Sequence, residues 1–178
     1  MKEIEVKILE INKKEVEKKL KQMGAKKAFD GLIDAQNFDF PDRRIKKKKN
    51  LLRLRKMDKK VFLTYKIKSK AKSQAKVCEE IELEVMDFEK MKLIFENLGL
   101  ETKTRIKKHR TSYKLGSTHF EIEQYLGEYS NVPCFLEIEA PSIKVINKYA
   151  KKLGFNEKDC LNWNTWDVVE HYEKVKNL

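Results

Sequence analysis

Apolar and charged residues alternate strictly in several short stretches of the chain. Three of these stretches contain Glu-Ile-Glu, at residues 3–5, 80–82 and 137–139. Alternation of this kind predicts a strand with one buried face. Because successive side chains of a strand point to opposite sides, both glutamates of each copy share one face. Crowded carboxylates repel one another unless a cation lies between them, so the repeated pattern indicates a divalent metal ion.

A helical periodicity follows each copy of this pattern. The expected helices lie between a capping side chain and a closing glycine, at residues 12–24, 87–99 and 142–154. Each has apolar residues three and four positions apart, which form a stripe that can pack on a sheet. A fourth helix is expected after the capping residue Asn164. All four helices are therefore expected to be amphipathic.

The alternating stretches predict about eight strands. They are residues 2–9, 33–40 (after a turn at Gly31), 51–56, 61–68, 79–86, 100–115, 119–125 and 137–139. Residues 42–50 hold the basic run Arg43 to Lys49, which is interpreted as a loop, either simply solvated or a lip that attracts an anionic substrate. No Pro-, Gly- or Ser-rich linker divides the chain, so residues 1–178 are expected to form one mostly antiparallel α+β domain.

The charged faces of these strands are sorted by sign. Glutamates gather at 3–5, 80–84, 121–123 and 137–139, and Arg or Lys at 53–55, 66–68 and 108–110. A sheet with one face in water would also carry charges, but it would mix the signs. If the helices cover the apolar face from outside, the charged face turns inward. We therefore expect an α+β fold whose eight antiparallel strands form a closed β-barrel, or tunnel, with amphipathic helices packed on its outside.

A charged interior is tolerable only when its ions are paired. Arginines bind phosphate oxygens in bidentate fashion, and Mg²⁺ prefers carboxylate and phosphate oxygens as ligands. A polyanion together with one or two metal ions would satisfy both kinds of side chain. This division of roles is typical of phosphoryl transfer.

The overall charge narrows the range of partners. The chain has 40 Lys and Arg against 28 acidic residues, a balance of +12, which favours an anionic partner such as nucleic acid, a membrane surface or polyphosphate. The apolar runs are too short for a membrane helix, and the key basic residues are interleaved with core aliphatics, which argues against nucleic acid. Three cysteines without paired spacing and a charged N-terminal strand predict a cytoplasmic protein. A homodimer is left open.

The charged motifs, taken in order, resemble the CYTH family, also called triphosphate tunnel metalloenzymes. Glu3-x-Glu5-x-Lys7 is similar to the N-terminal signature of that family. The other motifs follow in the family's order over about residues 1–140: Arg53-x-Arg55, Lys66, Glu80-x-Glu82, Lys108-x-Arg110, Glu123 and Glu137-x-Glu139.

The resemblance implies a role for each of these residues. Mg²⁺ or Mn²⁺ would be held by Glu3, Glu5, Glu80, Glu82, Glu123, Glu137 and Glu139. The triphosphate would be bound by Lys7, Arg53, Arg55, Lys66, Lys108 and Arg110. Lys66 and Glu123 would also take part in catalysis.

The implied function is that of a divalent-metal-dependent phosphohydrolase acting on a small-molecule triphosphate. Inorganic tripolyphosphate, a nucleoside triphosphate and thiamine triphosphate are the candidate substrates. The alternative is a class IV adenylyl cyclase that converts ATP to cyclic AMP and pyrophosphate. Cyclisation requires the ribose and base to be held rigidly, and since no residue plainly offers a base pocket, hydrolysis is ranked first. A non-catalytic polyphosphate- or nucleic-acid-binding module is the further alternative.

Overall fold

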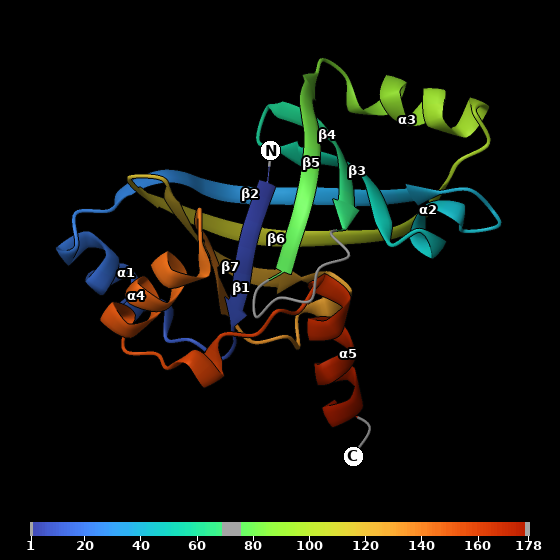
Figure 1. Ribbon diagram of the computed structural model, residues 1–178. Coiled ribbons are helices and arrows are strands. Elements are labelled where there is room, and N and C mark those ends of the chain that lie inside the picture. Colours follow the sequence, from blue (N-terminus) through green and yellow to red (C-terminus); the bar gives the residue numbers. More distant parts are fainter. Residues whose placement is uncertain (1, 69–75, 177–178) are drawn as a thin grey trace. The chain divides into compact units, whose positions relative to one another are not determined.

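The computed structural model describes residues 2–68 and 76–176 (Figure 1). Within these ranges the chain forms eight strands, five α-helices and two short 3-10 helices. The elements are β1 Lys2–Ile8, α1 Lys13–Gln22, β2 Lys26–Asp39, α2 Arg44–Lys47, β3 Asn50–Met57, β4 Lys60–Lys68, β5 Lys76–Val85, α3 Phe88–Asn97, β6 Glu101–Leu115, β7 Thr118–Leu126, η1 Gly127–Tyr129, β8 Phe135–Glu139, α4 Ile143–Leu153, η2 Glu157–Asp159 and α5 Thr165–Lys176. The strand pairings with an assigned register are antiparallel, so the predicted α+β class with antiparallel strands is confirmed.

The described chain divides into two compact units. The first contains residues 2, 31–68 and 78–108, and the second contains residues 3–30, 76–77 and 109–176. Strands β1, β2, β5 and β6 contribute residues to both units. The closure of all eight strands into one tunnel, and the single domain over residues 1–178, stay predictions.

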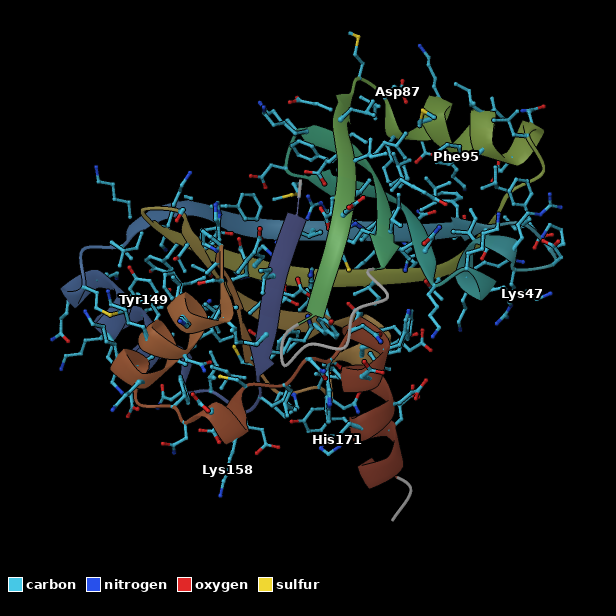
Figure 2. The ribbon with its side chains drawn as sticks, viewed as in Figure 1. Lys47, Asp87, Phe95, Tyr149, Lys158 and His171 are labelled. Carbon is cyan, nitrogen blue, oxygen red and sulfur yellow. The ribbon has the colours of Figure 1, made fainter. Side chains whose placement is uncertain are left out.

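In the first unit, strands β2, β3, β4 and β5 pair in that order. The apolar side chains of one face form a core in which Phe38, Leu54 and Val61 pack with Phe95 of α3. The Phe38 and Phe95 rings meet edge to face at 5.0 Å, and Figure 2 shows Phe95 on its helix. Asp87 begins α3, since its carboxylate accepts a hydrogen bond from the Lys90 backbone N–H at 3.0 Å. The opposite face carries the charged residues.

In the second unit, β7 pairs with β8 and β8 pairs with β1. Helices α1 and α4 lie side by side against this sheet (Figure 1). The core that they share with the strands contains Val6, Ile8, Val16, Leu20, Phe120, Ile122, Leu136, Ile138, Ile146 and Ala150. Both units therefore cover their apolar strand face with amphipathic helices, as the sequence predicts.

Two predictions about local structure are wrong. Strand β2 runs without a break through Gly31, where a turn was expected. An isolated glycine weakens a strand but does not end it when the neighbouring strands pair on both sides of it. The basic run, expected to be a loop, contains the short helix α2. Figure 2 shows Lys47 of this helix at the surface.

Helix α2 begins where it does because of a carboxylate that precedes it. Asp39 is only 5% exposed, and its two oxygens accept hydrogen bonds from the backbone N–H groups of Ile45 at 3.0 Å and Lys46 at 2.9 Å. These are N–H groups that a helix start leaves without an intrahelical partner. The negative charge also stabilises an otherwise basic segment. Asp39, the side chain that stabilises the helical start of the basic run, therefore lies outside that run.

We expect Asp39→Ala to lower the free energy of unfolding by about 1–2 kcal/mol, because two backbone N–H groups at the helix start lose a buried acceptor. Urea denaturation measures this change. Asp42→Ala is the matched control, because the exposed Asp42 carboxylate contacts only Arg44 among the described residues and its loss should change stability little. Equal effects of the two substitutions would contradict the role given to Asp39.

Candidate functional site

The second unit gathers charged side chains on the face that its helices leave uncovered. In the register of β1 with β8, Glu5 lies opposite Glu139 and Lys7 lies opposite Glu137. In the register of β7 with β8, Glu121 lies opposite Glu137. Directly opposed residues have Cβ atoms about 5 Å apart, so these carboxylates are neighbours. The strand alternation predicted from sequence therefore brings the acidic residues of three strands together.

Lys7 lies at the centre of this face and is almost fully buried. Its ammonium nitrogen is 2.7 Å from Glu137 Oε1 and 3.1 Å from Glu5 Oε1. Burial disfavours the charged ammonium, but the Glu137 and Glu5 carboxylates outweigh it and raise the pKa of Lys7 well above its ordinary value. Its backbone N–H and C=O are both bonded to Leu161 at 2.8 Å. Lys7 is thus held in place as a cation that contacts the carboxylates of Glu5 and Glu137.

Arg110 is the second cation of this face. Its Nε lies 2.6 Å from Glu123 Oε1, and its terminal nitrogen also bonds that oxygen. The guanidinium reaches Glu137 Oε2 at 3.3 Å and Glu121 Oε2 at 3.6 Å. Burial opposes its charge, yet the carboxylates of Glu123, Glu121 and Glu137 raise the pKa of Arg110 above its ordinary value. Glu123 is fully buried beside this guanidinium.

Three further residues belong to this cluster. Glu121, which the sequence prediction leaves out, accepts a hydrogen bond from the Ser112 hydroxyl. Tyr125 is buried, and that burial, together with the charges of Glu137 and Glu123, raises the pKa of its hydroxyl. Ser112 and Tyr125 each lie two residues beyond a predicted site residue on the same strand face. Strand alternation alone could have identified them.

The first unit holds a separate cluster on the charged face of β3, β4 and β5. Arg53 lies opposite Thr64, which lies opposite Glu82, and Lys66 lies opposite Glu80. The contacts follow this register, since Arg53 and the Thr64 hydroxyl reach Glu82 Oε2 at 4.0 and 2.6 Å.

Two more cations join this cluster. Arg55 reaches Glu82 Oε2 at 3.1 Å, and Lys66 forms an ion pair with Glu80. Thr64 is fully buried and was not predicted.

The remaining predicted residues are Lys108, Glu139 and Glu3, and they are described by their strand positions and burial. Lys108 is half-buried in β6, and Glu139 is half-buried opposite Glu5. Glu3 belongs to β1, but its side chain lies outside the described part of the chain. The structure thus brings together most of the predicted residues within each unit: Glu5, Lys7, Arg110, Glu123 and Glu137 in the second, and Arg53, Arg55, Lys66, Glu80 and Glu82 in the first. The role of each residue stays a prediction.

The charged cluster of the second unit offers the donor atoms that a hard divalent ion prefers. Glu5, Glu137 and Glu139 offer only oxygen donors, and Mg²⁺ is commonly bound by one or two carboxylates together with substrate phosphates. Within residues 2–68 and 76–176, no three His, Cys, Asp or Glu side chains converge as a preformed metal site. Glu137 directs one oxygen to Lys7 and the other to Arg110. The oxygen donors of these residues therefore suit such an ion, and its binding stays a prediction.

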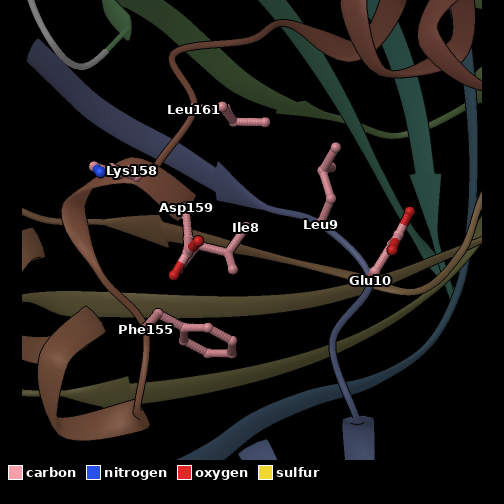
Figure 3. Close-up of a pocket in the computed structure, with 7 residues that line it drawn as sticks. All are labelled: Ile8, Leu9, Glu10, Phe155, Lys158, Asp159 and Leu161. Carbon is pink, nitrogen blue, oxygen red and sulfur yellow. The ribbon is translucent and has the colours of Figure 1, made fainter.

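A surface hollow of about 390 Å³ lies elsewhere in the second unit (Figure 3). Ile8, Leu9, Phe155 and Leu161 supply its apolar lining, and neither charged cluster contributes to it. Its Glu10 carboxylate already accepts the Tyr172 hydroxyl at 2.9 Å. This hollow therefore does not offer the chemistry of the clusters.

None of the helices in the described ranges has the length and apolar character that crossing a bilayer requires. This finding agrees with the sequence analysis, which finds no apolar run of membrane-spanning length.

Comparison with known proteins shows similarity over nearly the whole chain. The profile of the family described as the CYTH domain matches residues 1–154. A Methanocaldococcus jannaschii protein, provisionally named an adenylate cyclase, is 34% identical over 151 residues, which are 85% of this chain and 83% of the relative. The match leaves residues 155–178, with α5, outside the family profile.

Solved structures show the same fold. The Pyrococcus horikoshii protein PH1012 aligns with a TM-score of 0.75 at 29% identity, covering 94% of this chain and 98% of its own. A Hippeastrum protein, provisionally named an adenylyl cyclase and described as having a dominant triphosphatase activity, aligns with a TM-score of 0.69 at 15% identity, covering 95% of each chain. The latter likeness is one of fold alone.

Proposed function

Because the chain belongs to the CYTH family, we propose that it is a divalent-metal-dependent triphosphatase. The observation that supports this most strongly is the pairing of buried cations with carboxylates on one sheet face, at Lys7 and Arg110. Such pairs are costly to bury. They become useful if, on substrate binding, phosphate oxygens replace the carboxylates as partners of the cations and a metal ion replaces the cations as the partner of the carboxylates. Tripolyphosphate, a nucleoside triphosphate and thiamine triphosphate remain the candidate substrates.

Substrate binding would exchange one set of ion pairs for another. Arg53, Arg55 and Arg110 present planar guanidinium groups that match phosphate oxygens, whereas Lys66 acts as a point charge. Their carboxylate partners would turn away from these cations as phosphate oxygens replace them. Lys7 is enclosed by Glu5 and Glu137, so we assign it the positioning of those carboxylates rather than a direct phosphate contact.

The proposal includes closure of the eight strands into one tunnel, so that both clusters serve a single substrate. Family membership supports this closure, and so does the matched composition of the clusters, each of which pairs cations with glutamates. A triphosphate carries several negative charges in a row and would need cations along its length.

Glu5, Glu137 and Glu139 would hold Mg²⁺ or Mn²⁺. When bound, the ion would polarise phosphoryl oxygens and help position the attacking water. Glu80 and Glu82 are the further predicted ligands. Glu123 is fully buried against Arg110, and we assign it the orientation of that guanidinium. Lys66 would stabilise the charge that develops on the transferring phosphoryl group.

The alternative within the same family is adenylyl cyclase activity. The relative that is 34% identical carries that name, whereas the described activity of the Hippeastrum protein is dominated by triphosphate hydrolysis. In cyclisation the 3′-hydroxyl of ATP attacks the α-phosphorus and pyrophosphate leaves. Hydrolysis of the terminal phosphoryl group instead releases orthophosphate. The products therefore separate the two reactions.

We expect orthophosphate to be released from at least one of tripolyphosphate, ATP and thiamine triphosphate, and only with Mg²⁺ or Mn²⁺. The assay incubates the full chain with each compound and resolves orthophosphate, pyrophosphate and cyclic AMP. Cyclic AMP with stoichiometric pyrophosphate would replace the proposal by the cyclase alternative. Binding that falls steeply with salt, ignores the metal and yields no product would indicate a polyanion-binding module.

A further inference from the structure

A row of polar side chains crosses the charged face of the first unit and includes Asn37. In the strand register Asn37 lies opposite Arg53, and Arg53 lies opposite Thr64. Directly opposed residues point to the same side of a sheet, so Asn37 shares the face of the proposed phosphate ligand Arg53. Asn37 belongs to none of the charged motifs. The row therefore contains a neutral side chain directly beside a cation of the candidate site.

One end of the Asn37 amide is hydrogen-bonded and the other is not. Its Nδ2 donates a hydrogen bond to the Thr104 hydroxyl oxygen at 2.9 Å. Its Oδ1 is buried, and no donor in the described part of the chain bonds to it. The adjacent Gln36 differs, because its Oε1 accepts the Thr102 hydroxyl at 3.2 Å. A buried acceptor without a donor destabilises a fold, so the open oxygen of Asn37 needs an explanation.

A phosphate group is a poor partner for this oxygen. The ionised oxygens of a triphosphate chain accept hydrogen bonds, and an amide oxygen does the same, so the two repel each other. Arg53, directly beside Asn37, has only donors and attracts phosphate oxygens. A ligand that satisfies both side chains has a phosphate at Arg53 and a hydrogen-bond donor close to that phosphate.

We infer that Asn37 is a specificity-determining residue whose Oδ1 accepts a hydrogen bond from a ribose hydroxyl of a nucleoside triphosphate. This inference rests on the proposed function and names the substrate class for the same site. Opposed residues have Cβ atoms about 5 Å apart, so the donor must lie only a few bonds from the phosphate that Arg53 binds. Ribose hydroxyls meet this requirement. Tripolyphosphate carries no such group, and the amino group of thiamine triphosphate lies on a second ring, remote from its phosphates.

Substrate binding gives the oxygen access to its partner. Arg53 contacts the Thr64 hydroxyl at 3.5 Å and Glu82 Oε2 at 4.0 Å. When phosphate oxygens replace Glu82, the guanidinium moves away from its present position beside Asn37. The ribose arrives on the same phosphate and brings its hydroxyls to the side of the amide that this movement uncovers. The bond from Nδ2 to Thr104 keeps the amide in place, with Oδ1 available as the acceptor.

The test compares kcat/KM for ATP, 2′,3′-dideoxy-ATP and tripolyphosphate with Mg²⁺. The dideoxy compound keeps the base and the triphosphate but lacks both hydroxyl donors. We expect the natural chain to prefer ATP over the dideoxy compound by about 5- to 10-fold, the effect of one hydrogen bond. Asn37→Ala should lower kcat/KM for ATP by the same factor and leave the values for the other two compounds unchanged.

Two further variants separate the acceptor from other properties of Asn37. Asn37→Asp keeps an oxygen acceptor at the same position, so it should keep the preference for ATP over the dideoxy compound while its charge weakens the use of every triphosphate. Asn97→Ala is the matched control, because Asn97 is exposed on α3 and donates a hydrogen bond to the Leu93 carbonyl at 2.8 Å. It should leave all three values unchanged.

Equal losses for ATP and tripolyphosphate in Asn37→Ala would overturn the inference, because Asn37 would then serve phosphate binding or folding rather than the sugar. Equal use of ATP and the dideoxy compound by the natural chain, or turnover of tripolyphosphate alone, would also overturn it. If no compound is hydrolysed, the proposed function fails separately. Dissociation constants from equilibrium dialysis with Mg²⁺ then replace kcat/KM, and a natural chain that binds ATP no more tightly than the dideoxy compound would overturn the inference.

Discussion

Arg110→Ala is expected to abolish triphosphate turnover and to lower the free energy of unfolding by about 3–5 kcal/mol. Arg110 contacts the fully buried Glu123 at 2.6 Å, and it also bonds Glu137. Removing it leaves carboxylates close together in a site sheltered from water. The proposed phosphate ligand is lost in the same step.

The two effects can be separated by a second substitution. Arg110→Ala combined with Glu123→Gln removes the buried negative charge together with its partner, so urea denaturation should show part of the stability restored. Turnover should remain absent, because the phosphate ligand is still missing. Recovery of activity along with stability would show that Arg110 matters only for folding.

Glu5→Gln is expected to raise the Mg²⁺ or Mn²⁺ concentration needed for half-maximal turnover by at least about tenfold, and to lower kcat by about 100-fold. Glutamine keeps the size of the side chain but offers a neutral, weaker oxygen donor. Glu5 lies opposite Glu139, so the change removes one of two facing carboxylates. Lys7 keeps its closer partner, Glu137, at 2.7 Å, and the fold should therefore persist.

Metal titration of the initial rate measures this effect. Glu84→Gln is the matched control, because Glu84 is exposed, pairs with Lys60 at 3.0 Å and belongs to neither proposed metal set. An unchanged metal requirement in Glu5→Gln would contradict the assignment of Glu5 as a ligand.

Strand alternation predicted the charged faces well because it depends only on local geometry. The pairing of Lys66 with Glu80 and of Lys7 with Glu137 joins residues whose faces the sequence assigned correctly. The helices that cover the apolar faces were equally visible, since their caps and apolar stripes are local signals. Asn12 and Ser142 both accept the expected backbone hydrogen bonds.

What the sequence did not show depends on contacts between distant residues. Thr64 belongs to the cluster of the first unit because strand register places it beside Glu82. The helical start within the basic run depends on Asp39, whose carboxylate accepts a hydrogen bond from the Ile45 backbone N–H, six residues further along the chain. The exposure of Leu98 follows from where α3 packs, and its helical period alone would have placed it in the core. Register and packing, not residue type, decide these cases.

The most direct test of a single site that uses both clusters is the kcat/KM for the hydrolysed triphosphate in Arg53→Ala. Arg53 belongs to the first unit and Arg110 to the second. The matched control is Arg105→Ala, since Arg105 also lies in the first unit but is half exposed and bonds Asp34 at 2.8 Å. If both clusters bind one triphosphate, Arg53→Ala lowers kcat/KM by about 10- to 100-fold, while Arg105→Ala leaves it unchanged. Equal values for Arg53→Ala, Arg105→Ala and the natural chain would contradict a shared site.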